Sequence, residues 1–191
     1  RQAINNSSPY KNVLTHGFVV DAEGQKMSKS VGNIISPQKI IKDKGADILR
    51  MWVAMTDYTK EMTISDEIIK RVSESYRRIR NTSKFLLSNI NDFDVNNFDK
   101  SNLLVLDKWI IHKAEEMNKQ IRNDYEEFRF NKIMKDVINF CTLELGGYYL
   151  DIIKDRLYTS KSDGIPRYSA QMTCYVPVSY THLTLPTIGE V

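Results

Sequence analysis

Lys26-Met27-Ser28-Lys29-Ser30 is the stretch from which the rest of this 191-residue sequence can be interpreted, and Val31-Gly32-Asn33 follows it directly. Two lysines and two serines fall within five residues, between an expected turn at residues 21–24 and a glycine. Lysine ammonium groups are compact charges on flexible stems, while serine hydroxyls and backbone N–H groups donate hydrogen bonds to phosphate oxygens. The stretch therefore predicts a mobile loop that grips a polyanion, of which ATP is the natural example, and that stabilises a transition state.

The residues of the loop and its flanks carry a family resemblance. Lys-Met-Ser-Lys-Ser-x-Gly-Asn resembles the second signature of the class I aminoacyl-tRNA synthetases. The flanks at residues 9–21 and 45–52 are similar to the isoleucyl-tRNA synthetase family, and so are four downstream segments, at residues 64–68, 77–82, 139–145 and 149–158. The resemblance covers nearly all of residues 9–176. The loop signature is specific to the class, whereas the downstream segments favour isoleucine over valine, leucine or methionine.

The resemblance implies a function and assigns roles to loop residues. It implies an isoleucine–tRNA ligase, which joins isoleucine to ATP as an adenylate, releases pyrophosphate and passes the acyl group to tRNA(Ile). Lys29 is then the leading catalytic residue and Lys26 supports it. The ATP-binding set comprises Lys26, Met27, Ser28, Lys29 and Ser30. Magnesium is expected only as the counter-ion of ATP, and the full-length enzyme is expected to be a monomer.

The family also has parts that this sequence lacks. A complete enzyme would carry a His-Ile-Gly-His type ATP signature, the other half of the nucleotide fold and an editing domain upstream of the loop. The sequence opens without a methionine, at Arg1. We therefore expect a piece of a longer enzyme that is inactive by itself.

Composition restricts the class of protein further. Hydrophobic residues make up 41% of the chain and charged residues 27%, as in an ordinary globular protein, and the formal net charge is +3. Cys141 and Cys174 lie far apart and there are only three histidines, so no zinc site is expected. No apolar run approaches the ~20 residues that cross a bilayer. A reduced, cytoplasmic protein with no membrane contact is the simplest interpretation.

The first part of the chain reads as the end of a Rossmann-like nucleotide-binding domain, assigned to residues 1–57. A near-continuous apolar run at residues 13–21 predicts a buried strand. Ser36 and Pro37 are typical of a helix start, with Ile40 and Ile41 on the buried side, and a second helix is expected over about 46–55. Its inward set is Ile48, Leu49, Trp52 and Val53. The pattern breaks at residues 57–62, which we take as a domain boundary.

Long helices follow the boundary, so the chain as a whole is expected to be predominantly helical. Apolar residues recur at three- and four-residue steps over about 66–90, 103–125 and 131–157, which predicts an antiparallel helical bundle at residues 58–177. By resemblance this bundle is the anticodon-binding domain. Gly146-Gly147 predicts a kink or close helix contact in the last of these helices. Inward positions in that helix include Cys141, Leu145, Tyr148, Tyr149 and Ile152.

The first long helix is basic along its second half. Arg77, Arg78, Arg80 and Lys84 suit contact with RNA phosphates, and a plain solvated helix face is the alternative. With the loop signature upstream, contact with tRNA is the better interpretation.

Residues 178–191 abandon the helical pattern and resemble a translated sequencing adapter, so we interpret them as a non-native tail. Two other functions stay open: a non-catalytic helical RNA-binding module, and a sister synthetase for valine, leucine or methionine. A Gly-rich phosphate-loop NTPase is disfavoured because Gly-x-x-x-x-Gly-Lys-Ser/Thr is absent from the sequence.

Overall fold

The computed structural model describes residues 8–97 and 99–184, and it divides the chain into two compact units after Lys70. The sequence placed this division earlier, after residue 57. The difference arises because strand β2, Met62–Thr63, pairs with strand β1, Val19–Val20, so the segment after Asp57 belongs with the first unit.

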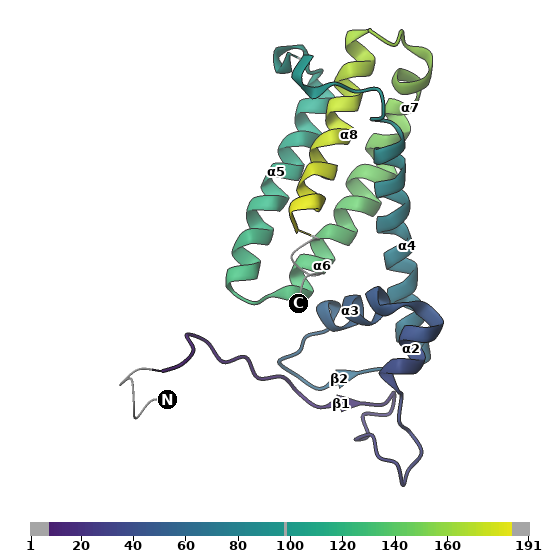
Figure 1. Ribbon diagram of the computed structural model, residues 1–191, viewed down its shortest axis with the longest axis vertical. Helices are drawn as coiled ribbons and strands as arrows, with labels where there is room; N and C mark the ends of the chain where they lie inside the picture. The colour runs from purple at the N-terminus through teal and green to yellow at the C-terminus, as the bar shows by residue number, and fades with distance from the viewer. Residues whose placement is uncertain (1–7, 98, 185–191) are drawn as a thin grey trace. The chain divides into compact units, whose positions relative to one another are not determined.

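The first unit is a small α/β structure (Figure 1). Strands β1 and β2 are parallel, with Val19 opposite Met62 and Val20 opposite Thr63. Parallel neighbours require a crossover connection, which here contains helices α2, Pro37–Lys44, and α3, Ala46–Met55. The expected α/β character and both helices are confirmed.

The core of the first unit gathers around Trp52. Its ring is buried, and its indole N–H donates a hydrogen bond to the Thr63 carbonyl at 3.2 Å, which satisfies the one polar atom of the side chain. This bond fastens α3 to β2. The buried apolar side chains of this unit are Val20, Ile40, Ile48, Met51, Trp52, Met62, Ile64 and Ile69.

Several side chains expected inside the first unit are exposed. Val13 and Phe18 are each 68% exposed and Leu14 is 44% exposed, so the prediction of a buried strand over residues 13–21 is wrong except near Val20. The physical reason is that β1 pairs over two residues only, and no described segment forms a layer over the residues before it. Ile41 and Val53 are exposed as well, because each helix buries a narrower stripe than its apolar residues suggested.

Two helix starts were predicted from capping residues. The Ser65 hydroxyl accepts a hydrogen bond from the Ile68 N–H at 3.2 Å, which confirms it as the cap of α4. Ser36 precedes Pro37 as expected, but its hydroxyl donates to the Gln38 side chain at 2.7 Å and leaves the backbone uncapped.

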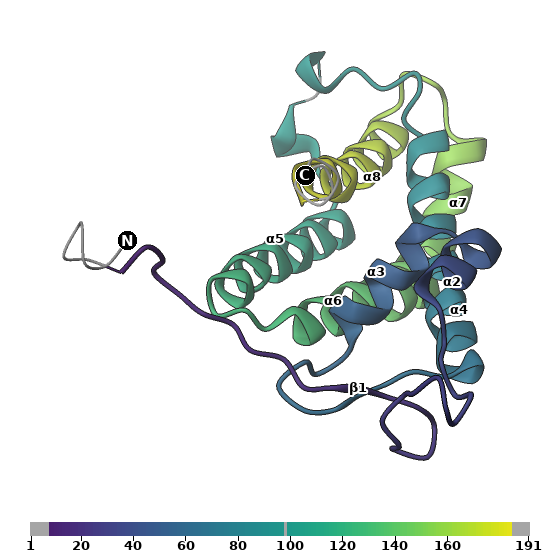
Figure 2. The same cartoon turned by 60° about the horizontal axis from the view of Figure 1, so that its bottom comes forward.

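The second unit is an antiparallel helical bundle, as the sequence predicted. Helix α4, Asp66–Ser88, leads into it, and two short 3-10 helices, Val95–Asn97 and Lys100–Asn102, precede α5, Val105–Glu126. After α4 and α5, the third long helical rod of the bundle consists of three consecutive segments. These are α6, Phe130–Asn139, π-helix η3, Phe140–Tyr149, and α7, Leu150–Thr159. Helix α8, Ile165–Thr184, closes the bundle. Both views show α8 beside α5, and both helices run opposite to α6–α7 (Figures 1 and 2).

The bundle core draws side chains from all of its rods. Its buried members are Leu86, Ile110, Ala114, Phe140, Leu145, Tyr149, Leu150, Ile153, Leu157, Ala170 and Cys174. Burial raises the pKa of the Cys141 thiol to about 11 and that of Cys174 to about 12. Both thiols therefore stay protonated at neutral pH, which agrees with a packing role for Cys141.

The π-helix explains why the prediction of which side chains of the third rod point inward is partly wrong. A π-helix has more residues per turn than an α-helix, so ten residues of it rotate the buried face away from the expected 3.6-residue phase. Tyr148 and Ile152 are consequently exposed, while Ile153 and Leu157 are buried. The two glycines permit this geometry. A Cβ on Gly146 would lie 2.8 Å from the carbonyl oxygen of Cys141, five residues earlier.

Apolar spacing does not predict helix α8, which continues to Thr184 through Pro177. The prediction that helical structure ends before residue 178 is therefore wrong. Three of its buried residues, Ser169, Gln171 and Thr173, are polar and broke the apolar period. Residues 185–191 lie outside the described residues, and a non-native origin for the tail stays a prediction.

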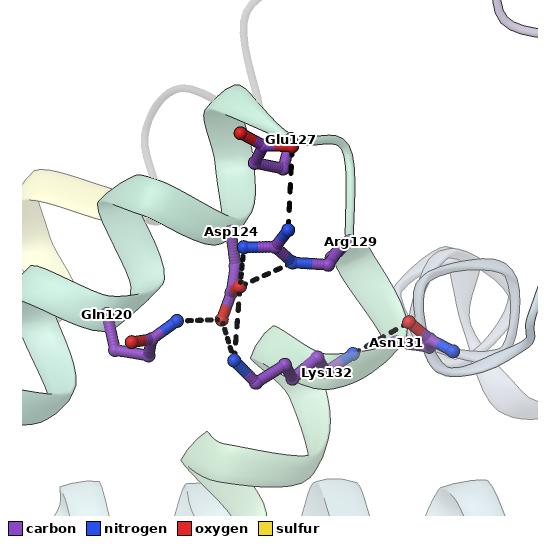
Figure 3. Close-up of polar contacts among 6 residues, drawn as sticks. All are labelled: Gln120, Asp124, Glu127, Arg129, Asn131 and Lys132. Carbon is purple, nitrogen blue, oxygen red and sulfur yellow. Dashed lines mark hydrogen bonds and ion pairs between the residues drawn. The ribbon is translucent and has the colours of Figure 1, made fainter.

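A buried carboxylate stabilises the turn between α5 and α6 (Figure 3). Asp124 is fully buried and accepts hydrogen bonds from Arg129 at 2.8 Å and from Gln120 at 3.1 Å, while Lys132 Nζ lies 3.2 Å from it. The Arg129 backbone N–H also donates to the Asp124 carbonyl at 2.8 Å. Paired charges thus hold the turn, together with ring contacts of Phe130 with Tyr125 and Phe128.

Candidate functional site

The Lys26–Ser30 loop leaves β1 through a tight turn. The Gly24 N–H donates to the Asp21 carbonyl at 3.1 Å, and the Asp21 N–H donates to the Gln25 carbonyl at 3.0 Å. Gly24 has a φ of +75°, a conformation that glycine adopts without strain. Val20 and Lys26 then form an antiparallel bridge, so the first residue of the loop lies alongside β1.

The side chain of Asp21 organises the start of the loop. One carboxylate oxygen accepts hydrogen bonds from the backbone N–H groups of Glu23, at 3.1 Å, and Gln25, at 2.7 Å. The other accepts a hydrogen bond from the Asn33 side-chain amide at 2.7 Å. These bonds, that from Asn33 foremost, lower the pKa of Asp21 below its ordinary value. Asp21 is therefore an ionised acceptor that joins the two ends of the loop.

Asn33 contacts the loop from its other end. Its side-chain carbonyl accepts a hydrogen bond from the Ser28 N–H at 2.9 Å, and its amide group also points to the Lys26 carbonyl at 3.4 Å. Asn33 follows the loop in the sequence and Asp21 lies in the predicted turn, but neither was predicted to have a role in the site. The signal that could have revealed them is chemical, since Asp and Asn side chains commonly bond to nearby backbone groups in turns.

The tip of the loop is held by its own serines. The Ser28 and Ser30 hydroxyls lie 3.1 Å apart, and the Ser28 hydroxyl accepts a hydrogen bond from the Val31 N–H at 3.3 Å. The Gly32 N–H donates to the Ser28 carbonyl at 3.2 Å, and Gly32 takes a φ of +76°. Both hydroxyls are thus engaged with the loop itself in this state.

The remaining loop side chains differ in their surroundings. Lys29 is exposed and forms no hydrogen bond or ion pair with the residues that the structure describes. The Lys26 ammonium nitrogen lies 5.3 Å from the ring centre of Phe18, within cation–π distance. The Met27 sulfur accepts a hydrogen bond from the Ile35 N–H at 3.5 Å, so this side chain packs within the loop. Both lysines are exposed, and Lys29 is the one with no close partner among the described residues.

The basic residues of α4 form a second candidate site, in the second unit. Arg77, Arg78, Arg80 and Lys84 are all exposed, and none forms an ion pair with another described residue. Arg80 and Lys84 line one open hollow, whose other lining residues are Ser83, Leu87, Ser88 and Asn91. Arg77 and Arg78 do not line it. The structure therefore brings together two of the four predicted RNA-binding side chains.

The part of the chain that the structure describes contains neither a candidate membrane span nor a candidate metal cluster. None of the helices there has both the length and the apolar character needed to cross a membrane. Across the same residues, His, Cys, Asp and Glu side chains nowhere gather in groups of three or more that would suit a metal ion.

Two families match this chain. Residues 2–65 match the family described as tRNA synthetases class I (I, L, M and V), and residues 107–183 match the anticodon-binding domain of tRNA ligase. The second match continues past residue 178, into the stretch interpreted as a tail. The chain therefore belongs to the class I tRNA synthetases and combines a piece of the catalytic domain with an anticodon-binding domain.

Within that class, the chain is similar to isoleucine–tRNA ligases. The chain is 58% identical over 174 residues to that of Vesicomyosocius okutanii and 54% identical over 171 residues to that of Ruthia magnifica. It is 51% identical over 175 residues to the isoleucine–tRNA ligase of a Marinomonas species. These matches cover 91%, 88% and 91% of the chain, but the chain spans only 18%, 18% and 19% of the relatives' lengths.

A solved structure has a similar fold. The LeuRS of Agrobacterium radiobacter K84, determined as a ternary complex with tRNA and LeuAMS, matches with a TM-score of 0.60. The match covers 88% of this chain and 21% of that one, at 20% sequence identity. At that identity the likeness concerns the fold alone.

Proposed function

We propose that this chain is the part of an isoleucine–tRNA ligase that supplies the ATP phosphate loop and the helices that bind tRNA. The whole enzyme would join the isoleucine carboxylate to the α-phosphorus of ATP, release pyrophosphate, and pass the isoleucyl group to tRNA(Ile). Relatives at 51–58% identity support the choice of amino acid. The observation that carries the proposal is the exposed Lys29, which has no partner among the described residues and lies on a loop held at both ends by Asp21 and Asn33.

Lys29 is the proposed catalytic residue of the loop. Negative charge accumulates on the pyrophosphate as it leaves, and an ammonium group that reaches this charge lowers the barrier of the step. Lys26 supports it by moving from the Phe18 ring to the phosphates, where an anion attracts it more strongly than a ring does. Met27, Ser28 and Ser30 complete the proposed ATP contacts, and magnesium would enter as the counter-ion of ATP.

The four basic side chains of α4, Arg77, Arg78, Arg80 and Lys84, are the proposed contact with tRNA(Ile). Arg80 and Lys84 share a hollow with polar side chains, which suits a phosphate group and its neighbouring sugar. Arg77 and Arg78 extend positive charge along the same helix. We further propose that the full-length enzyme acts as a monomer in the cytoplasm, and that this chain alone forms no adenylate because ATP must be held from two sides.

Two alternative functions predict different behaviour. A non-catalytic RNA-binding module would use α4 but would have no need of a lysine loop fixed by Asp21 and Asn33. A sister synthetase would use the same loop with another amino acid.

The test is pyrophosphate exchange by a protein in which this chain follows the upstream part of an isoleucine–tRNA ligase. Radiolabelled pyrophosphate should enter ATP with isoleucine present, and much less with valine, leucine or methionine. Exchange driven best by another amino acid would identify a sister synthetase. No exchange with any of the four, by a folded protein that binds tRNA, would favour the RNA-binding module.

A further inference from the structure

We propose that Asn33 is a positioning residue of the phosphate loop, and that together with Asp21 it holds Lys29 where a phosphate chain can reach it. This inference rests on the proposed function and adds a role that the family matches do not assign. Asn33 contacts neither Lys29 nor, by the proposal, the nucleotide. Its effect passes through the backbone at Lys26 and Ser28.

The hydrogen bonds of Asn33 use both ends of its amide group. The N–H₂ group donates to the Asp21 carboxylate at 2.7 Å and points to the Lys26 carbonyl at 3.4 Å, while the oxygen accepts from the Ser28 N–H at 2.9 Å. A residue here must therefore donate and accept at once. Aspartate would keep the acceptor but lose the donor and face the Asp21 carboxylate, and alanine would lose both.

These contacts close a loop of the chain at its base. Asp21 and Asn33 lie twelve positions apart, and their side chains join through a single 2.7 Å hydrogen bond. The two backbone groups that Asn33 contacts lie on either side of Met27, and Ser28 directly precedes Lys29. When these two groups are fixed, the tip of the loop has fewer conformations before a ligand binds. The entropy cost of ordering the loop on binding is therefore smaller.

The arrangement also resolves a charge conflict. A carboxylate beside a phosphate site would repel the phosphate. Asp21 is only 9% exposed, and its two oxygens accept hydrogen bonds from Glu23, Gln25 and Asn33. The negative charge of Asp21 is therefore neutralised in part by hydrogen-bond donors at the base of the loop, whereas Lys29 is exposed at the tip.

The experiment compares this 191-residue chain with its Asn33→Ala and Asn33→Asp variants, and Asn12→Ala is the matched control. Asn12 is an exposed asparagine in the same unit, outside the loop. Two quantities are measured by NMR: the hydrogen-exchange rate of the Ser28 N–H, and the affinity for inorganic tripolyphosphate followed at the amides of residues 26–30. The N–H groups of residues in α3 show whether each variant remains folded.

Both Asn33 variants should weaken the affinity for tripolyphosphate by about three- to tenfold, since a disordered loop must be ordered on binding. Asn33→Ala should also speed exchange at Ser28 by about tenfold or more, because the acceptor of that N–H is gone. Asn33→Asp keeps an acceptor for the Ser28 N–H, so the exchange of this N–H should speed up less than in Asn33→Ala. Asn33→Asp should nevertheless bind tripolyphosphate no better than Asn33→Ala. Asn12→Ala should match the parent in both measurements.

Three results would overturn the inference. Unchanged exchange at Ser28 in Asn33→Ala would show that the side chain does not hold the loop. Faster exchange with unchanged tripolyphosphate affinity would show a brace with no positioning role, and the proposed function would stand. If tripolyphosphate perturbs none of residues 26–30 in the parent chain, the phosphate loop itself is misassigned, and the proposed function fails together with the inference.

Discussion

Arg156 binds Asp107 through two parallel hydrogen bonds, from Nη1 to one carboxylate oxygen and from Nη2 to the other, each 2.7 Å long. Asp107, on α5, is fully buried, and the Arg156 side chain, on α7, is 17% exposed. The Tyr149 hydroxyl donates to the same carboxylate at 2.5 Å, and the Ser169 hydroxyl on α8 does so as well. One carboxylate thus connects three rods of the bundle.

Removing one partner of this pair should destabilise the bundle strongly. Arg156→Ala leaves the Asp107 carboxylate buried without its cation, and such losses cost about 3–5 kcal/mol. Urea unfolding followed by circular dichroism measures the change. Lys154→Ala is the control, because Lys154 pairs with Asp151 at 2.7 Å on the exposed surface and should cost about 1 kcal/mol or less. Equal losses in the two variants would show that the buried pair has no special role.

The sequence predicted the bundle more fully than it predicted what joins its rods. Apolar spacing located α4, α5 and the α6–α7 rod, because their buried faces repeat at three- and four-residue steps. Apolar spacing did not reveal α8. In that helix, buried Ser169 donates a hydrogen bond to the Asp107 carboxylate, and buried Gln171 donates one to the Asp92 carboxylate at 2.7 Å. The Ser169 hydroxyl and the Gln171 side-chain N–H₂ group find their partners in distant segments, and no local sequence pattern records such partners.

In the phosphate loop, too, the sequence predicts local features but not the contacts between residues that are far apart in the chain. The lysines and serines could be assigned from their own sequence, since the chemistry lies in adjacent residues. The link between Asp21 and Asn33 depends on how the chain turns between them, so it became visible only in the structure. The exposure of Val13 and Phe18 depends likewise on which segments lie over them.

Asp124 should make the stability of the protein depend on pH. Burial alone would raise the pKa of Asp124, but hydrogen bonds from Arg129, Gln120 and Lys132 outweigh it and lower the pKa from its ordinary 3.8. A carboxyl whose pKa is lowered by folding stabilises the folded state fully above its unfolded pKa. That contribution is lost as the pH falls through the folded value.

The measurement for Asp124 is urea unfolding of the parent chain and Asp124→Asn from pH 7 to pH 3. The variant should be less stable at pH 7, and the difference should shrink below about pH 4, as the unfolded parent takes up a proton that its folded form resists. Asp163→Asn, an exposed position before α8, should differ little from the parent throughout. A difference that grows toward acid pH would contradict the assigned direction.

Gly17 should tolerate no side chain. Its N–H donates to the Tyr58 carbonyl at 2.8 Å, and a Cβ at this position would lie 2.0 Å from the Lys60 carbonyl oxygen. Gly17→Ala must therefore displace the backbone beside β1, and we expect a loss of about 2–4 kcal/mol in the free energy of unfolding, as for overpacked sites. Gly24→Ala meets no atom within 4 Å but adopts a φ of +75°, so about 1 kcal/mol is expected. A larger loss at Gly24 than at Gly17 would refute the steric argument.

The four basic side chains of α4 should determine how RNA binding depends on salt. Each phosphate contact releases counterions, so the slope of log K against log salt flattens by up to about one unit for each contact removed. Arg80→Ala with Lys84→Ala should weaken tRNA binding and flatten this slope by about two units or somewhat less, and adding Arg77→Ala and Arg78→Ala should flatten it further. Lys113→Ala, on α5 and paired with Glu116, is the control. An unchanged slope in the quadruple variant would exclude α4 as a phosphate contact.

Lys29 should act on the rate of adenylate formation more than on the binding of ATP. In the protein restored with its upstream domain, Lys29→Ala removes a charge that matters most when negative charge builds on the leaving pyrophosphate. Loss of one such group typically costs ~3 kcal/mol, on the order of a hundredfold in rate. Single-turnover measurements with isoleucine separate this rate from the dissociation constant of ATP, and Lys39→Ala, on the exposed surface of α2, should change neither. Because Lys29 has no partner among the described residues, its removal should leave the unfolding free energy of the chain unchanged, which excludes misfolding as the cause. If the variant raises the dissociation constant of ATP and keeps the adenylation rate, the loop is a binding clamp and Lys29 has no role in the transition state.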